Sequence, residues 1–193
     1  MSESHAAETD SAVTDTAVVR RCQRGDRDAF AALIERHRSV LFGTAYLMTR
    51  DRQMAEDAVQ EALVKMWLHI GSVRNPAGLK AWLVRIVVNE VRQLARKKTV
   101  TTLTLEELPD PPGEDGAAAL AGVEIRQDLA RAMGMLPTDQ REVVVLRFFS
   151  ELTVPEIAEA TGWRQGTVKS RLSRAMDKLG EMLRGYQGGE GRK

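Results

Sequence analysis

Residues 153–179, "TVPEIAEATGWRQGTVKSRLSRAMDKL", predict two short helices separated by a tight turn. Thr153 and Glu156 have the spacing of a capping box, in which each side chain satisfies a backbone N–H group at the start of a helix. Gly162 is expected to end the first helix, and the second helix is expected over about residues 166–184. Two short helices joined by such a turn are typical of a helix-turn-helix.

The second of these helices has two contrasting sides when it is projected at 100° per residue. One side is apolar, and the opposite side carries hydrogen-bond donors and no acid. Arg pairs with guanine in the major groove, while Lys and Ser hold phosphates. A solvated amphipathic helix has a similar pattern, but an acid-free side that follows a capped helix and a glycine turn favours DNA binding. The apolar side holds Val168, Leu172, Ala175, Met176, Leu179 and Leu183; the donor side holds Thr167, Ser170, Arg171, Arg174 and Lys178, with Lys169 nearer the apolar edge.

The charge of the chain is divided unevenly along its 193 residues, although its net value is only +1. Residues 74–98 hold seven Lys or Arg and one acid, whereas residues 99–124 hold six acids and no Lys or Arg. Such blocks predict a local basic surface beside an acidic linker. The single cysteine, Cys22, excludes an intramolecular disulfide. The sequence shows neither a secretory signal nor an apolar run near the roughly 18 residues of a membrane span, so we expect a cytoplasmic protein without membrane insertion.

Helical spacing predominates along the chain, and strand patterns are scarce. We expect an all-α protein of two small helical domains joined by a flexible acidic linker, the second domain being the helix-turn-helix. Gly25 is expected to end a short helix, Asp26 and Asp51 to cap the next two, and Thr138 to cap a helix through Phe149. The expected boundaries are a disordered N-terminus at 1–15, a first domain at 16–98, the linker at 99–122, a second domain at 123–186 and a disordered tail at 187–193.

Apolar residues at helical spacing predict the buried sides of three helices in the first domain. They are Phe30, Leu33, Ile34, Leu41, Ala45 and Met48 in the first helix, Ala55, Ala58, Val59, Ala62, Met66 and Ile70 in the second, and Leu79, Trp82, Leu83, Ile86 and Leu94 in the third.

Three stretches of the chain together resemble extracytoplasmic-function sigma factors, the small subunits that direct bacterial RNA polymerase to promoters. Residues 136–179, "LPTDQREVVVLRFFSELTVPEIAEATGWRQGTVKSRLSRAMDKL", resemble region 4; "MAEDAVQEALVKMW", residues 54–67, resembles region 2.2; and "NPAGLKAWLVRIVVNEVRQLARKK", residues 75–98, resembles regions 2.3 and 2.4. Region 4 implies docking on the polymerase β flap and binding of the promoter −35 element. The implied −35 contacts, combined with the donor side above, are Arg147, Thr167, Lys169, Ser170, Arg171, Arg174 and Lys178.

Arg164 departs from the resemblance, because the family often has a Ser at this position. A Ser side chain can cap the helix that follows, and an Arg side chain cannot. We expect Gln165 or the backbone to compensate, or Arg164 to contact a phosphate.

An acidic helix side in the first domain is formed by Asp57, Gln60 and Glu61, with Val64 next along it. Taken alone, these residues fit a solvated surface better than a binding site. The resemblance implies that they bind the clamp helices of the polymerase β′ subunit.

A basic row on the following helix contains Arg85, Asn89, Arg92 and Arg96 within about 60° of arc. This spacing suits a strand of phosphates. The resemblance implies that this surface, with the loop of residues 72–78 before it, holds the melted −10 element with one base flipped out, at an unstacking cost of a few kcal/mol. The implied −10 contacts are Arg74, Asn75, Arg85, Asn89, Arg92, Gln93 and Arg96; Gln93 departs from the acid or Asn often found there.

The resulting interpretation is a promoter-specificity subunit that initiates transcription of a stress- or signal-responsive set of genes. Its partners would be core RNA polymerase (β′ clamp helices and β flap), promoter DNA and an anti-sigma factor as a further candidate. No cofactor or metal is expected, and no nucleophile constellation indicates an enzyme. A stand-alone helix-turn-helix regulator is the alternative interpretation, and a helical adaptor is a weaker one. His37, His69, Cys22 and Trp82 are expected to be structural, and Trp163 to pack between the two helices of the motif.

Overall fold

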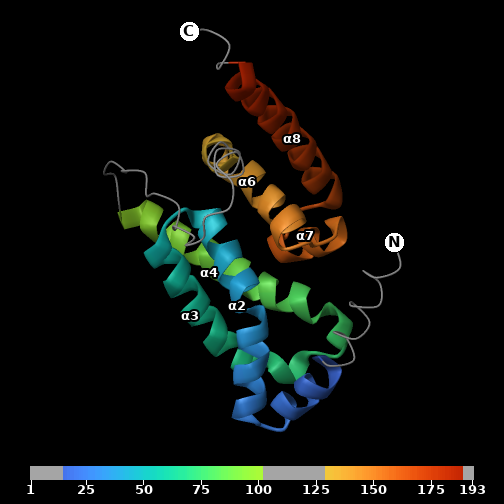
Figure 1. Cartoon of the computed structure of the whole chain (residues 1–193). Helices are drawn as coiled ribbons and strands as arrows, with labels where there is room; N and C mark the ends of the chain where they lie inside the picture. The colour runs from blue at the N-terminus through green and yellow to red at the C-terminus, as the bar shows by residue number, and fades with distance from the viewer. Residues whose placement is uncertain (1–14, 102–128, 189–193) are drawn as a thin grey trace, which may run out of the picture. The chain divides into compact units, whose positions relative to one another are not determined.

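The computed structural model describes residues 15–101 and 129–188 of the chain (Figure 1). Within these two ranges the regular elements are helices, and no strand is present. The predicted all-α class is therefore confirmed. The chain divides into two compact units, the first made mainly of the residues up to Thr101 and the second mainly of the residues after it. The predicted disordered segments up to residue 14 and from residue 189, and the linker from residue 102, lie outside the described residues.

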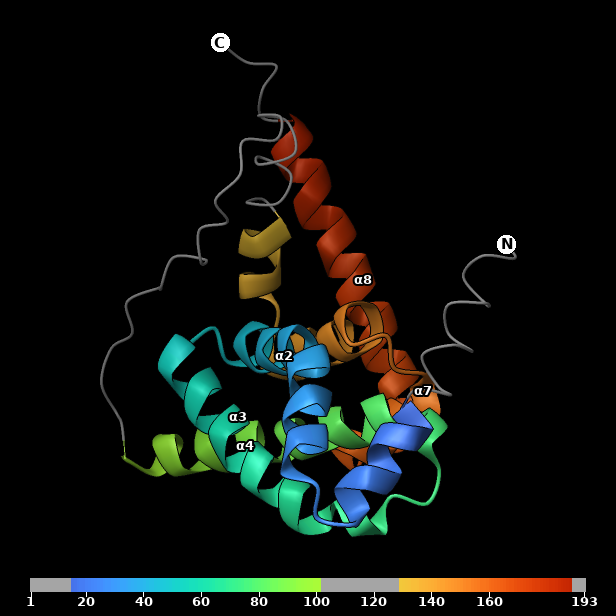
Figure 2. The same cartoon turned by 60° about the horizontal axis from the view of Figure 1, so that its bottom comes forward.

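The first unit is built around three long helices. Residues 15–23 are helical, so Asp15 belongs to a helix and not to the predicted disordered N-terminus. The elements that follow are α2 (Arg27–Thr49), α3 (Arg52–His69), the 3-10 turns η1 (Ile70–Ser72) and η2 (Pro76–Gly78), and α4 (Leu79–Thr101). Figures 1 and 2 both show α2, α3 and α4 side by side. Since α4 reaches Thr101, the first three residues of the predicted linker are helical.

Aspartate side chains start α2 and α3, as predicted. Asp26 accepts a hydrogen bond from the Ala29 N–H group at 2.9 Å, and Asp51 accepts one from the Met54 N–H group at 3.0 Å. Each bond satisfies a backbone donor that has no partner inside the helix. The Ala29 N–H group, together with Arg21, also lowers the pKa of the Asp26 carboxyl. Gly25 before the cap has φ +83°, a conformation that glycine adopts without strain.

The core of the first unit lies where α4 packs against both α2 and α3. Small residues on α3 are fully buried, which lets the helix backbones approach closely. The predicted buried sides of α2 and α3 are largely right, whereas that of α4 is partly wrong: Leu79 and Leu83 are buried, but Trp82, Ile86 and Leu94 are only half-buried. The valines between them face the core instead. The fully buried residues of this core include Leu33, Leu41, Ala55, Ala58, Ala62, Met66, Leu83, Val84, Val87 and Val88.

The second unit consists of shorter helices and one long one. Residues 129–135 are helical, followed by α6 (Thr138–Val144), the π-helical turn η3 (Val145–Phe149), α7 (Val154–Thr161) and α8 (Gln165–Gly188). Thr138 does not cap α6, contrary to the prediction: Pro137 occupies the cap position and makes no side-chain bond. The predicted tail also begins too early, because α8 continues to Gly188.

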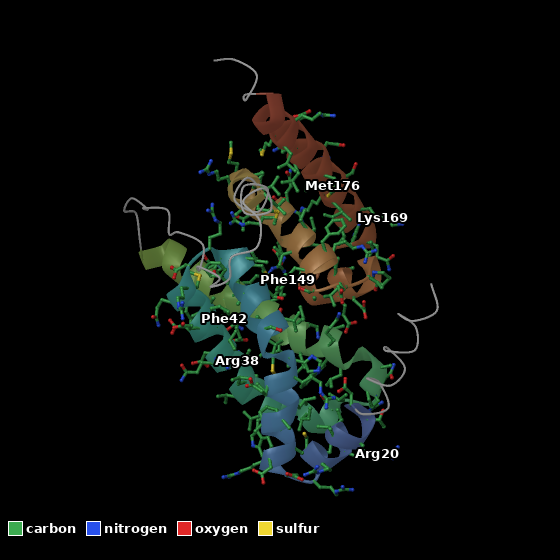
Figure 3. The ribbon with its side chains drawn as sticks, in the orientation of Figure 1. Arg20, Arg38, Phe42, Phe149, Lys169 and Met176 are labelled. Carbon is green, nitrogen blue, oxygen red and sulfur yellow. The ribbon has the colours of Figure 1, made fainter. Side chains whose placement is uncertain are left out.

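The core of the second unit lies between α6, α8 and the helical residues 129–135. Ala132, Leu136, Val144, Ala175 and Leu179 are buried together, with Leu172 and Leu183 packed against them. Most of the predicted apolar side of α8 is therefore confirmed. Met176 is an exception, since it is exposed (Figure 3). No helix among residues 15–101 and 129–188 is long and apolar enough to cross a membrane.

Candidate nucleic-acid and polymerase interfaces

The start of α7 and the turn after it have the local geometry of the predicted helix-turn-helix. The Thr153 N–H group donates to the Glu156 carboxylate at 2.8 Å, and the Glu156 N–H group donates to the Thr153 hydroxyl at 3.4 Å, so both bonds of the capping box form. Gly162 has φ +72° and ends α7 in the left-handed conformation. The Arg164 carbonyl accepts the Val168 N–H group at 3.1 Å, so Arg164 supports the start of α8 through its backbone. Any residue at this position can make that bond, so it does not replace a Ser side-chain cap, and compensation by Gln165 or the backbone stays a prediction.

The exposed side of α8 carries Lys169, Ser170, Ser173 and Arg174 (Figure 3 labels Lys169), and also one acid, Asp177, so the expectation of an acid-free side is wrong for the side that is exposed. Thr167 and Lys178 are half-buried at its edges. Relative to the prediction, this donor side is rotated toward Lys169, which was placed near the apolar edge. Ser173 was missed, although its spacing of four residues from Lys169 was visible in the sequence.

Arg171 points into the second unit and not outward with its neighbours. Its Nε donates to the Asp139 carboxylate at 2.8 Å, and its guanidinium lies 3.8 Å from the centre of the Trp163 ring. The Arg171 side chain is only 24% exposed. These contacts fasten α8 to α6 and to the turn, so the structure does not support Arg171 as a leading groove contact. Trp163 lies in the turn, as predicted, and its ring packs against Arg171 of α8.

Arg147 lies on η3 and is exposed. Its Nη1 donates to the Leu152 carbonyl at 3.1 Å, across the connection that leads to α7. This hydrogen bond occupies one N–H group of the Arg147 guanidinium and stabilises the connection. The side chain remains accessible to a DNA backbone.

The predicted −10 residues on α4 lie on its outer side. Asn89, Gln93 and Arg96 are exposed, while Arg85 and Arg92 are half-buried. The first three form one stripe at spacings of four and three residues, which is one side of a helix. The side-chain amides of Asn89 and Gln93 and the guanidinium of Arg96 are therefore exposed on the same side of α4.

The loop before α4 is held in place by a residue that the sequence did not indicate. Gln23, at the end of the first helical segment, donates from Nε2 to the Val73 carbonyl at 2.9 Å and to the Ile70 carbonyl at 3.3 Å. Asn75 caps η2 by accepting the Ala77 N–H group at 3.1 Å, and Arg74 is exposed. A spacing of about 50 residues gives no sequence signal for such a contact.

The acidic side of α3 is exposed and is continued by apolar side chains. Asp57, Gln60 and Glu61 are exposed, as are Val64 and Leu68, the last two at 56% and 69%. Apolar side chains as exposed as these, in line with an acidic patch, mark a surface suited to another protein.

Two family models match the chain. Sigma-70 region 2 matches residues 33–101, and Sigma-70, region 4 matches residues 126–179. The ECF RNA polymerase sigma factor SigM of Mycobacterium tuberculosis is 37% identical over 163 residues, which is 84% of this chain and 80% of the relative. The chain belongs to the extracytoplasmic-function (ECF) sigma factors. It is a promoter-specificity subunit of RNA polymerase, and the stand-alone regulator is not favoured.

Other sigma factors agree with this assignment. The ECF RNA polymerase sigma-E factor of Escherichia coli is 29% identical, with 86% of this chain and 93% of the relative covered. The solved structure of the sigma factor RpoE in complex with the anti-sigma factor NepR from Bartonella quintana is 31% identical, covers 80% of this chain and 96% of that one, and has a TM-score of 0.66. CnrH in complex with the cytosolic domain of CnrY is 26% identical, covers 89% and 97% of the two chains, and has a TM-score of 0.64.

His37, Cys22 and Trp67 of this sigma factor pack within its first unit. His37 is buried 3.9 Å from the Asp15 carboxylate, and burial lowers the pKa of its imidazole. Cys22 is buried, and burial raises the pKa of its thiol, which makes it unreactive. The Trp67 ring packs edge-on against Phe30 at 5.1 Å between centroids. No group of three metal-binding side chains occurs among the described residues.

Proposed function

We propose that this sigma factor holds the −35 duplex with the outer side of α8. Lys169, Ser170, Ser173 and Arg174 are the contacting residues, with Thr167 and Lys178 at the edges and Arg147 and Arg164 on the backbone. Arg174 is the best placed to donate to a guanine edge, because no ion pair competes for it among the described contacts of α8. Arg171 positions the helix through Asp139 and Trp163.

The melted −10 element is held by α4 and the loop before it. Asn89 and Gln93 supply amides that can pair with base edges, and Arg85, Arg92 and Arg96 supply charge for the phosphates. Arg74 and Asn75 take part from the loop. Support for this assignment comes from the exposed amide pair beside Arg96.

Core RNA polymerase is bound through α3, whose Asp57, Gln60 and Glu61 meet the β′ clamp helices. The exposed Val64 and Leu68 add apolar contact area to that acidic patch. The second unit docks on the β flap. An anti-sigma factor that covers these surfaces would keep the protein inactive, and the solved relatives RpoE and CnrH are each seen in complex with a second protein.

The protein acts in the cytoplasm and has no enzymatic activity of its own. Its contribution is the choice of promoter and the stabilisation of melted DNA, for which positioned donors and charges suffice.

The observation that carries this function is the presence of two separate donor-rich surfaces, on α8 and on α4, in one chain. Run-off transcription with core polymerase on fragments of the source genome tests it. We expect defined transcripts that depend on this protein. Transcripts that are the same without it would contradict the proposal.

A further inference from the structure

Three arginines from different segments lie close together at one end of the first unit. Arg24 directly follows Gln23 and Arg74 directly follows Val73, and Gln23 Nε2 donates to the Val73 carbonyl at 2.9 Å. Arg27 is the first residue of α2, three residues after Arg24. All three arginines are exposed. The fold thus forms an arginine cluster (Arg24, Arg27 and Arg74) where the first helical segment, α2 and the loop before α4 meet.

The positive charge of the arginine cluster is not neutralised by its surroundings. With the part of the chain that the structure describes, its side chains form no hydrogen bond or ion pair. Asp26, the acid between two of the arginines, is already paired with Arg21 at 2.8 Å. Asp28 is exposed and opposes one of the three charges, which leaves two in excess. Exposed cations without a partner attract an anion from outside the chain.

The backbone that carries the cluster is fixed by contacts of other residues. At the start of the first helical segment, the buried Asp15 carboxylate accepts a hydrogen bond from Arg36 Nη1 of α2 at 2.6 Å. At its end, the Asp26 N–H group donates to the Arg21 carbonyl at 3.2 Å, and Gln23 bonds the loop. Binding of an anion therefore has to order only the arginine side chains and not the backbone, which lowers its entropic cost.

A nucleic-acid backbone is the anion that fits the cluster best. The guanidinium group matches phosphate geometry with two parallel N–H donors, and cations from three separate positions suit a repeated charge better than a single one. The cluster adjoins the beginning of the loop of residues 72–78, whereas α4 and its basic row follow the end of that loop. A strand that passes from α4 over the loop therefore reaches the cluster next.

We propose that the arginine cluster binds phosphates of the melted promoter strand outside the −10 element, on the flank that leaves the loop away from α4. The inference rests on the proposed binding of −10 DNA by α4 and the loop. Because the contact is to phosphates, it adds affinity and positions the strand without reading its sequence. Arg24 and Arg27 make the contact that is new, and Arg74 is shared with the −10 site.

The test compares open-complex formation by wild-type and R24Q/R27Q holoenzyme on one promoter at several salt concentrations. Arg74 stays unchanged because it belongs to the −10 site. A lost phosphate contact lowers the slope of log K against log salt by about 0.7 for single-stranded DNA, so we expect the slope to fall by about 1.4 and opening to weaken several-fold. R24K/R27K retains both charges and should retain the wild-type slope.

Neutral methylphosphonate linkages, introduced one at a time on each flank of the −10 element, locate the contact. In the wild type, one or two linkages on a single flank should weaken opening several-fold, and the same linkages should make no difference to R24Q/R27Q. Base substitutions at those positions should affect the wild type and R24Q/R27Q equally. A flank on which both proteins lose the same amount at every linkage would contradict a phosphate contact by the cluster.

The control variant R20Q/R38Q removes the same number of exposed charges. Arg20 lies one helical turn further from the loop contact, and Arg38 pairs with Glu35 on the surface of α2, so this variant should keep the wild-type slope. Both double variants should unfold at the wild-type temperature, because exposed side chains are replaced.

Three outcomes would overturn the proposal. An unchanged slope in R24Q/R27Q, or an equal decrease in R20Q/R38Q, would overturn the cluster proposal alone. Weaker binding of R24Q/R27Q to core polymerase without DNA would assign the cluster to a protein contact and overturn it too. Asn89→Ala that opens the promoter like the wild type would overturn the proposed −10 function of α4, on which the inference rests.

Discussion

Arg171 and Arg174 are three residues apart on α8, yet their side chains have different environments. Arg171 is paired with Asp139 and stacked on Trp163, whereas Arg174 is exposed. The sequence places both on one arc of the helix, because residues at i and i+3 are neighbours there. It cannot show that Asp139, from another helix, withdraws one of the two guanidinium groups from solvent.

Substitution by Ala should therefore affect these two arginines differently. Arg171→Ala should lower the free energy of unfolding by about 1–2 kcal/mol, since it removes a cation–π contact and a partly exposed ion pair. Arg174→Ala should leave stability unchanged and weaken −35 binding, with a loss of about 1–3 kcal/mol of preference for the guanine that Arg174 contacts. Thermal unfolding and titrations of duplexes that carry or lack that guanine measure both. Equal stability of the two variants would contradict the assignment.

His37 should make stability depend on pH. Burial lowers the pKa of its imidazole, and Arg36 and Lys80 act in the same direction against the opposing effect of Asp15. Because the unfolded state then binds a proton more readily, stability should be complete above the ordinary histidine value of about 6.5 and should fall as pH decreases below it. Unfolding midpoints between pH 5 and 7.5 check this. In His37→Leu the decrease should be smaller; an identical decrease would assign it to other groups.

At the scale of elements, the helix starts were predictable and the buried side of α4 was not. Asp26, Asp51 and Thr153 each bond backbone N–H groups within three residues, so their effect is visible in local sequence. Helix α4 packs against both α2 and α3, so apolar residues occupy more than one side. The spacing of apolar residues alone favours Trp82 and Ile86 as core residues. In the structure, Val84, Val87 and Val88 are the residues that are fully buried.

The loop between α3 and α4 should depend on Gln23 for its position. Gln23→Leu keeps the approximate size of the side chain but removes the donor to the Ile70 and Val73 carbonyls. We expect open-complex formation to fall several-fold, with polymerase affinity and −35 binding retained. Arg20→Ala, at an exposed position of the same helical segment, is the matched control. If both variants open the promoter like the wild type, Gln23 has no positioning role.

The acidic side of α3 should control assembly with polymerase. Replacing Asp57 and Glu61 by Lys reverses the charge of the surface without touching the core, since both are exposed. We expect core polymerase binding to fall by at least tenfold, because like charges across an interface cost several kcal/mol. Duplex −35 binding by the same variant serves as the control for folding. Normal polymerase binding would show that the clamp contact lies elsewhere.

In the molecule as a whole, the matches to sigma-70 regions 2 and 4 support the proposal that one chain contacts two promoter elements. The all-α class was predictable because helical spacing and helix caps are short-range patterns, and the sigma-factor family was predictable because three stretches of the sequence resemble its regions 2 and 4. Contacts between distant residues were not predictable. Arg171 with Asp139, Gln23 with the loop and Lys65 with Glu90 each join segments at least 25 residues apart.

We propose that α8 and α4 of this sigma factor bind the two promoter elements separately. The most direct measurement is footprinting of the holoenzyme on its own promoter, with permanganate to detect unpaired thymines at −10. The wild type should protect −35 and expose reactive thymines at −10; Arg174→Ala should reduce the protection at −35, and Asn89→Ala should reduce the reactivity at −10 with −35 protection retained. Loss of −35 protection in Asn89→Ala, or an unchanged footprint in both variants, would contradict the account.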